Sequence, residues 1–495
     1  MRFLFTFFLS FIIFIQSTAQ VNEKENIINA MHSISSHDLM AYVETICDDK
    51  YEGRLTGTDE YIECAEWLAS FFDKSGLEPA GDDGTWFQEF TLPYTLVYPD
   101  CGVSLEIPAG DKGVITKHYD YITEFMPGST SGNGTVNAEV IYAGYGISAP
   151  ELGYDDYNGI NVEGKIILIE REAPVSPSAG PGKFNPWREY SFHQYKLKNA
   201  VEHGAAGMIY NYGPIANPNN AYNKDFIYVH IGDSAVQDVF SGTGKDHREV
   251  VQRIKKKLKP NSFNTGKRAT IKMSTGHFEN GRGVNVIGHR KGDDPKLAEE
   301  TIIIGAHLDH LGKCYEIIPG ANDNASAVAV MMAVAKAIND YDISLKRSVL
   351  FLGFGAEEQA LVGSRKYVED PVNNIKKSVL LNMDGVGTGH SINATAGKDF
   401  PVLLKYFEDN AERYIHRPLR SNSFSNLGRP RLDASIFLSA GVPSLSFSTY
   451  GSRSYYHIPW DNIDMLNPEI MEDMARLLLL SLIDMANSKD DILQK

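Results

Sequence analysis

Residues 301–310 read TIIIGAHLDH, an apolar run that ends in side chains able to bind a metal ion. Two further apolar runs in the same half of the chain end in a similar way. The three endings are His307 after residues 301–306, Glu357 and Glu358 after 348–356, and Asp384 after 378–383. Helical patterns over 325–339 and 363–369 alternate with these strand-like runs. This alternation predicts an α/β fold, a doubly wound and mostly parallel sheet with helices on both faces. Ligands bind at the carboxyl ends of the strands in such sheets, so we expect the three endings to meet there.

The length of the chain, 495 residues, predicts more than one hydrophobic core. Between residues 98 and 266 the pattern changes to short β-type runs separated by Gly, Asn and Pro. This change indicates a β-rich module inserted into the α/β domain. We therefore expect the α/β domain in two parts, residues 20–97 and 267–495, with every candidate metal ligand in the second part.

The N-terminus has the pattern of a cleavable secretory signal over residues 1–19. A basic start precedes an apolar run from Phe3 to Ile15, and Ala19 ends a small-residue segment where cleavage is expected. The run is shorter than the roughly 20 residues that span a bilayer. We therefore expect an exported protein, periplasmic or extracellular, without a membrane span after signal cleavage.

The net charge and the cysteines of the chain argue against a nucleic-acid partner and against a cysteine metal site. The formal charge of −16 argues against nucleic acid as a partner, because nucleic acid is itself a polyanion. The cysteines lack the spacing of a metal site, so we interpret all four as structural or free. They are Cys47, Cys64, Cys101 and Cys314.

The polar residues near the strand ends each have an ordinary interpretation beside the chemical one. His307 and Asp309 lie two apart, which suits a metal ligand and the carboxylate that orients it, or a plain hydrogen-bonded pair. Asp323 precedes an apolar helix, where it is a helix N-cap or a ligand. Asp384 alone is a common strand-to-loop residue, and a lone histidine such as His457 is more often structural.

The adjacent carboxylates of Glu357 and Glu358 are harder to explain in an ordinary way. They follow a fully apolar run, where a buried acidic pair is costly without a cation. If a metal ion binds one of them, the other stays free as a general base. This pair therefore favours a metal-dependent hydrolytic site.

Five motifs, in this order along the chain, resemble those of the co-catalytic zinc aminopeptidases related to bacterial leucyl aminopeptidase and glutamate carboxypeptidase. They are Ala306-His307-Leu308-Asp309, Gly320-Ala321-Asn322-Asp323-Asn324-Ala325-Ser326, Ala356-Glu357-Glu358, Asn382-Met383-Asp384 and Tyr456-His457. The insertion resembles a protease-associated domain in its Ala143-Gly144-Tyr145-Gly146 segment and its Gly204-Ala205-Ala206-Gly207 turn. Such domains carry no catalytic residues and shape access to a site or dock substrates.

The resemblance implies a secreted zinc exopeptidase that removes N-terminal residues from peptides, with two zinc ions per chain. It implies one zinc on His307 and Asp384, the other on Glu358 and His457, and a bridge at Asp323. Glu357 would be the general base, Asp309 would orient His307, and Tyr456 would donate a hydrogen bond to the oxyanion. Many relatives carry Ser-Asp-His where this chain has Leu432-Asp433-Ala434, so the side-chain preference is not implied.

Three alternatives stay open. A glutaminyl cyclase has the same fold and a single zinc. A carboxypeptidase of this fold would need a cation for the substrate carboxylate, and the sequence does not place Arg429, Arg431 or Arg453 in such a pocket. A binding protein on an inactive peptidase scaffold, as in the transferrin receptor, predicts missing ligands.

Overall fold

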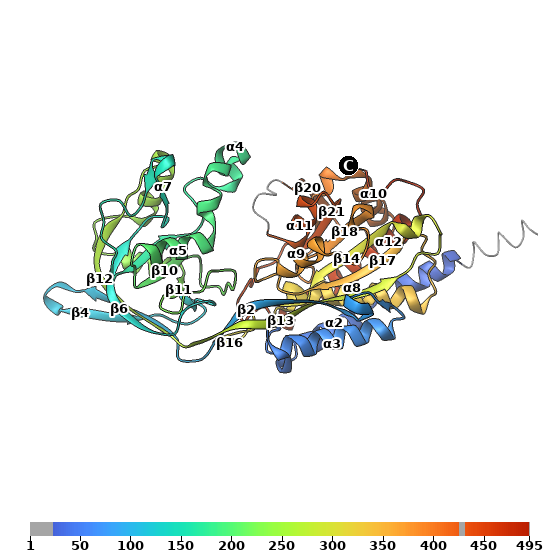
Figure 1. The fold of residues 1–495 in the computed structure, drawn as a ribbon, viewed down its shortest axis with the longest axis horizontal. Helices are drawn as coiled ribbons and strands as arrows, with labels where there is room; N and C mark the ends of the chain where they lie inside the picture. Colours follow the sequence, from blue (N-terminus) through green and yellow to red (C-terminus); the bar gives the residue numbers. More distant parts are fainter. Residues whose placement is uncertain (1–22, 425–430, 495) are drawn as a thin grey trace, which may run out of the picture.

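The computed structural model describes residues 23–424 and 431–494, so the predicted signal over 1–19 lies outside the described residues. The chain forms two lobes, each built on its own large sheet (Figure 1). The long strands β2 (Phe87–Val97) and β13 (Thr275–Arg290) pair with each other and run along the side where the lobes join. Within the described ranges, no helix has the length and hydropathy of a membrane span.

The larger sheet is parallel at its centre and mixed towards its edges. β17 (Ser348–Phe354), β14 (Thr301–His307), β18 (Ser378–Met383) and β21 (Ser444–Tyr450) run parallel in this spatial order. Antiparallel neighbours flank them: β13 pairs with β17, and β19 (Ser391–Thr395) pairs with β21. The predicted α/β fold is confirmed, and the parallel strands that carry the candidate ligands lie together at the centre.

Helices cover both faces of this sheet, as predicted. One core contains Ile302 and Ile304 of β14 together with four helices. These are α2 (Ser36–Ile46), α3 (Asp59–Lys74), α8 (Ser326–Asp340) and α12 (Pro468–Asn487). The opposite core contains Ile303 between them, with α9 (Val362–Glu369) and α11 (Asp433–Ser439). Successive residues of a strand face opposite ways, which is why a run of isoleucines serves both cores.

Helix α8 is buried nearly all round because its sequence, SAVAVMMAVAKAIND, is apolar on every face. Its alanines let neighbouring elements approach closely, and it contacts both α2 and α12. The start of this helix is therefore held firmly beside the strand ends.

The second lobe has a sheet of eight strands in the order β4-β3-β12-β6-β9-β10-β11-β5. Its parallel part is β6 (Gly134–Tyr142), β9 (Ile166–Glu170), β10 (Gly207–Asn211) and β11 (Ile227–Ile231). β12 (Phe263–Met273) pairs antiparallel with β6 and runs past residue 266, the predicted end of the insertion. This lobe has cores of its own.

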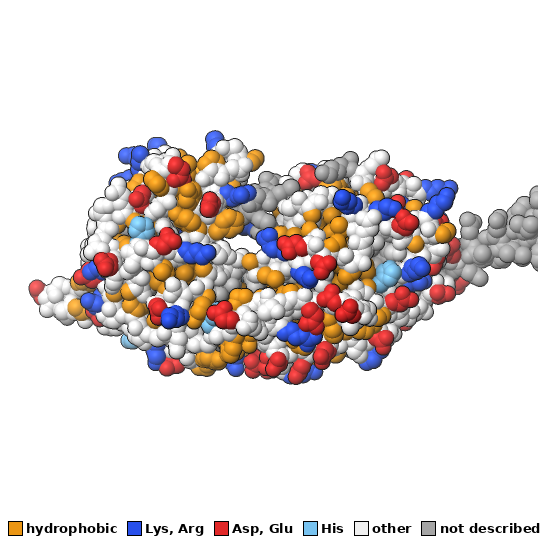
Figure 2. Space-filling model, in the orientation of Figure 1, with side chains coloured by type: hydrophobic (Ala, Val, Ile, Leu, Met, Phe, Trp, Pro, Cys, Tyr) orange, Lys and Arg blue, Asp and Glu red, His pale blue; other side chains and the backbone are white. Residues whose placement is uncertain are grey.

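On the face shown in Figure 2, the described Lys and Arg side chains are scattered among Asp and Glu rather than gathered into a basic patch. Binding to nucleic acid depends on basic side chains arranged along the phosphate backbone. The expectation that nucleic acid is not a partner rests on the net charge of the whole chain and stays a prediction.

Candidate metal centre

The ends of the central strands bring the predicted ligands together at one edge of the sheet. His307 is the last residue of β14, Asp384 follows β18 directly, and Glu358 lies in the loop after β17. Asp323 lies in the turn that leads into α8. That helix begins without a side-chain cap, so the ordinary interpretation of Asp323 as its N-cap does not apply.

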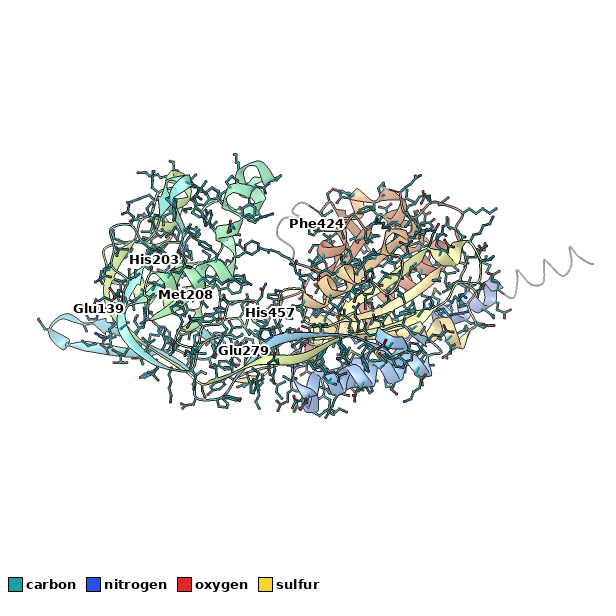
Figure 3. All side chains as sticks on the ribbon, in the orientation of Figure 1. Glu139, His203, Met208, Glu279, Phe424 and His457 are labelled. Carbon is teal, nitrogen blue, oxygen red and sulfur yellow. The ribbon has the colours of Figure 1, made fainter. Side chains whose placement is uncertain are left out.

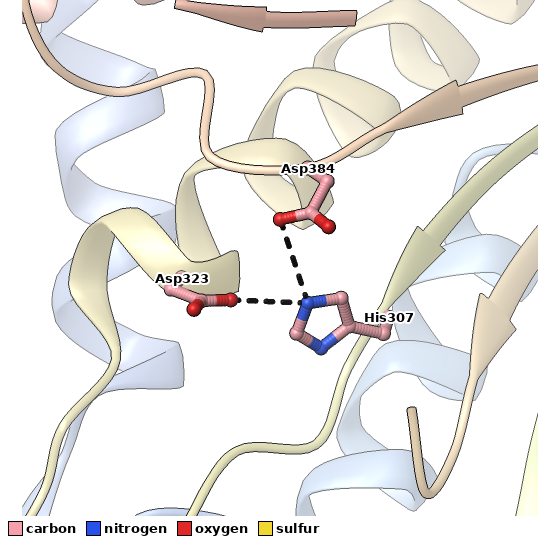
Figure 4. A group of neighbouring side chains, drawn as sticks. All are labelled: His307, Asp323 and Asp384. Atoms are coloured by element: carbon pink, nitrogen blue, oxygen red, sulfur yellow. Dashed lines mark ion pairs between the residues drawn. The ribbon is translucent and has the colours of Figure 1, made fainter. Parts of the chain in front are cut away.

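Asp323 stands between two histidines and offers one carboxylate oxygen to each. Its Oδ1 is 3.1 Å from Nε2 of His307, which also lies 3.9 Å from Oδ1 of Asp384 (Figure 4). Its Oδ2 is 3.6 Å from Nε2 of His457, which lies 3.0 Å from Oε2 of Glu358. The five residues therefore form two donor sets that share one carboxylate.

These donors fit zinc. The Nε2 atoms of His307 and His457 are buried and have no hydrogen-bond partner, although carboxylate oxygens face both. Buried polar atoms without partners are rare, and a cation among these nitrogens and oxygens would satisfy them. In the described residues, two groups of side chains lie close enough together to hold a metal ion: His307 with Asp323 and Asp384, and His310 with Asp323 and Glu358.

His310 also belongs to this site, although its sequence pattern gave it no role. Its side chain is fully buried, and its Nδ1 lies 2.9 Å from Oε1 of Glu358. Its ring is edge-on to that of His457, with centroids 5.7 Å apart. In the sequence, His310 is visible as the second histidine of HLDH. Its spacing alone could not show that it faces Glu358, which lies in the loop after another strand.

The Asp309 carboxylate binds the loop that carries Glu357 and Glu358, and the Asp309 backbone carbonyl faces the ring of His307. Its carboxylate accepts hydrogen bonds from the backbone N–H groups of Glu357 (3.1 Å) and Glu358 (3.3 Å). Nδ1 of His307 is 3.0 Å from the Asp309 backbone carbonyl and 3.7 Å from its carboxylate. The His307 ring can therefore donate to a carbonyl, which leaves Nε2 facing the site.

Asp461 holds the segment that carries the shared carboxylate. Its two oxygens accept the backbone N–H groups of Asn322 (2.9 Å) and Asp323 (3.0 Å), and its own carbonyl accepts that of Ala321 (3.0 Å). The loop that carries His457 is thus tied to the turn that carries Asp323.

The crowding of charges shifts the ionisation of these groups. Burial opposes charge on His457, but the carboxylates of Glu358 and Asp323 outweigh it and raise the pKa to about 10. Burial raises the pKa of Glu358, yet His457 and His310 lower it to about 2. Burial, with Glu358, Asp433 and Asp384 nearby, raises the pKa of Glu357 well above its ordinary value. The carboxylates and imidazoles of the site therefore influence one another's charge strongly.

Tyr456 lies flat against His457, with ring centroids 3.5 Å apart and an interplanar angle of 19°. Its side chain is half exposed, and the carboxylates of Glu358 and Asp323 add to burial in raising its pKa well above the ordinary value. The phenol therefore stays protonated and can act as a hydrogen-bond donor.

Arg54, from the first part of the chain, joins the loops that carry the candidate ligands through backbone carbonyls. The fully buried guanidinium donates to the carbonyls of Leu308 (2.9 Å), Pro319 (2.7 Å) and Gly320 (3.2 Å), and also to that of Ile46 (3.1 Å). It links the loop after β14 to the segment before Asp323. The sequence showed no sign of this role.

We expect Arg54→Met to lower the free energy of unfolding by about 3 kcal/mol or more, because four buried carbonyls lose a charged donor. Chemical denaturation of the purified protein measures this loss. Arg282→Met is the matched control, since that half-exposed arginine pairs with Glu89 at the surface and should cost less than about 1 kcal/mol. Equal losses in the two variants would contradict a special role for Arg54.

Comparison with known proteins shows what this part of the chain is similar to. Residues 285–482 match the family model described as "Peptidase family M28". Over this part, the chain is similar to the peptidases of family M28. Aminopeptidase YwaD of Bacillus subtilis is 27% identical over 67% of this chain and 66% of its own length. A glutamate carboxypeptidase 2 homolog of Caenorhabditis elegans is 22% identical over 88% of this chain and 66% of its own length.

The chain thus spans just under two thirds of the length of these two curated relatives. The solved structure of BSAP, a zinc aminopeptidase from Bacillus subtilis, has a similar fold with a TM-score of 0.60 and 20% sequence identity. The match covers 93% of this chain and 97% of that one, so the likeness extends over both lobes. The segment that matches the family model includes all the candidate ligands of the centre.

Proposed function

We propose that this protein is a peptidase of the M28 type, an exported zinc aminopeptidase that removes N-terminal residues from peptides. One zinc would be held by His307 and Asp384, the other by Glu358 and His457, with Asp323 as the bridge. The observation that carries this proposal is that the two oxygens of Asp323 face the Nε2 atoms of two different histidines. Residues 98–266 would form a protease-associated domain, and residues 1–19 a signal that is removed.

Zinc in such a site supplies a Lewis acid that activates water and polarises the scissile carbonyl. The protein supplies the proton transfers. Glu357 is partly exposed, and its backbone N–H is held by Asp309. Its carboxylate would take a proton from water and pass it to the leaving amine. The Tyr456 phenol would donate to the oxygen on which negative charge develops.

The charges around the site favour an amine over a carboxylate at the substrate terminus. Of the arginines that a carboxypeptidase could use, Arg431 pairs with Glu172 of the second lobe (3.0 Å), and the Arg453 guanidinium lies over the Tyr455 ring (5.1 Å). The third, Arg429, lies outside the described residues. The carboxylates of the site would attract a substrate ammonium instead.

Metal content and hydrolysis of aminoacyl-p-nitroanilides, measured before and after chelation, test this function. We expect two zinc ions per chain and release of p-nitroaniline that stops on chelation and returns with zinc. One zinc with cyclisation of N-terminal glutamine would instead support a glutaminyl cyclase. Release of C-terminal glutamate from peptides, with no p-nitroaniline, would support a carboxypeptidase, the activity named for the Caenorhabditis relative.

A further inference from the structure

The second lobe touches the candidate metal centre directly, through residues 213–217. This segment connects β10 to β11 and reaches His457, which lies where the two lobes meet (Figure 3). The backbone N–H of Ala216 donates to the carbonyl of His457 (3.0 Å). In return, Nδ1 of the His457 ring is 2.9 Å from the carbonyl of Ala216. Both residues are buried.

This double contact determines how His457 presents its ring. When Nδ1–H donates to the Ala216 carbonyl, the neutral ring keeps its lone pair on Nε2, the atom that faces Glu358 and Asp323. Outer partners of this kind fix the tautomer and the orientation of metal-binding histidines. His457 is also a non-glycine residue with φ of 60°, a backbone conformation that its surroundings must hold in place.

The segment is in turn anchored within the second lobe. Nδ1 of His230, on β11, donates to the carbonyl of Ile215 (2.7 Å), and the Ser129 hydroxyl accepts the N–H of Asn217 (3.0 Å). The backbone N–H of Gly213 donates to the carbonyl of Ile231, the last residue of β11 (3.0 Å). His230 is fully buried, so its bond to Ile215 is shielded from water.

We infer that the second lobe is a structural part of the metal centre: the 213–217 segment positions His457, and His230 and Ser129 position that segment. This inference rests on the proposed function, in which His457 is a zinc ligand. The inserted module would then take part in metal binding, in addition to shaping access to the site or docking substrates. It assigns His230 and Ser129 as positioning residues that touch neither metal nor substrate.

The test compares zinc retention by the purified full-length protein and its variants during dialysis against graded concentrations of a chelator. We expect His230→Phe to release one zinc per chain at about 10- to 100-fold lower chelator concentration than the wild type, while the other is retained as in the wild type. Ser129→Ala should shift the same zinc in the same direction. His230→Asn should restore retention, because its amide can donate to Ile215.

His203→Phe is the matched control, because His203 lies in the same lobe, away from His457 (Figure 3), and bonds Ser148 instead. Its zinc retention should equal that of the wild type. If folded His230→Phe and Ser129→Ala retain both zinc ions like the wild type, the inference is overturned while the proposed function stands. If the wild type itself binds no zinc, both are overturned.

Discussion

Glu357→Gln is expected to lower kcat by about 10²- to 10⁴-fold while both zinc ions stay bound. Among the described residues, no hydrogen bond or ion pair ties the Glu357 carboxylate to a candidate ligand, and its backbone N–H is held by Asp309. Glutamine has the same shape, so the loop and the neighbouring ligand Glu358 should keep their places. What the change removes is the group that accepts the proton.

Steady-state hydrolysis of the preferred aminoacyl-p-nitroanilide, together with zinc content, measures this effect. Glu369→Gln on α9 is the control, since that glutamate is exposed and should leave turnover unchanged. Wild-type turnover in Glu357→Gln would remove the general-base role from this residue. Loss of zinc in the same variant would instead make Glu357 a ligand.

Asp323→Ala should have the largest effect on metal binding, because its carboxylate faces both histidines and belongs to both groups of possible ligands. We expect the affinity for each zinc to fall by more than about 100-fold. Removing a ligand shared by both metal ions should weaken binding more than removing a hydrogen-bond partner of a ligand does. Zinc content after dialysis, measured by atomic emission, checks this. Asp340→Ala, at the exposed end of α8, is the control.

The same variant should respond differently to chelation. In the wild type, zinc stabilises the folded chain by binding it preferentially, so chelation should lower Tm. In Asp323→Ala, Tm should be nearly independent of chelator, because little zinc is bound. A drop in Tm on chelation as large as that of the wild type would show that Asp323 is not the shared ligand.

The sequence by itself determined the elements that carry the site. Apolar runs over 301–306, 348–356 and 378–383 became β14, β17 and β18 with nearly the predicted bounds, and the helical pattern over 325–339 became α8. These elements can be predicted because a central strand is buried on both faces and therefore carries almost only apolar side chains. The polar residues follow where the strands end.

The tertiary structure decided the contacts around those residues. Arg54 reaches Leu308 across 254 positions, and Ala216 reaches His457 across 241, so no local pattern could reveal either contact. Ala216 takes part in both bonds through its backbone N–H and carbonyl, which leaves no side-chain signature in the sequence. His310 was visible as a residue, but only the pairing of β14 with β17 places its ring against Glu358. Periodicity records which side chains are buried, whereas these roles depend on which chain segments the fold brings within hydrogen-bond distance.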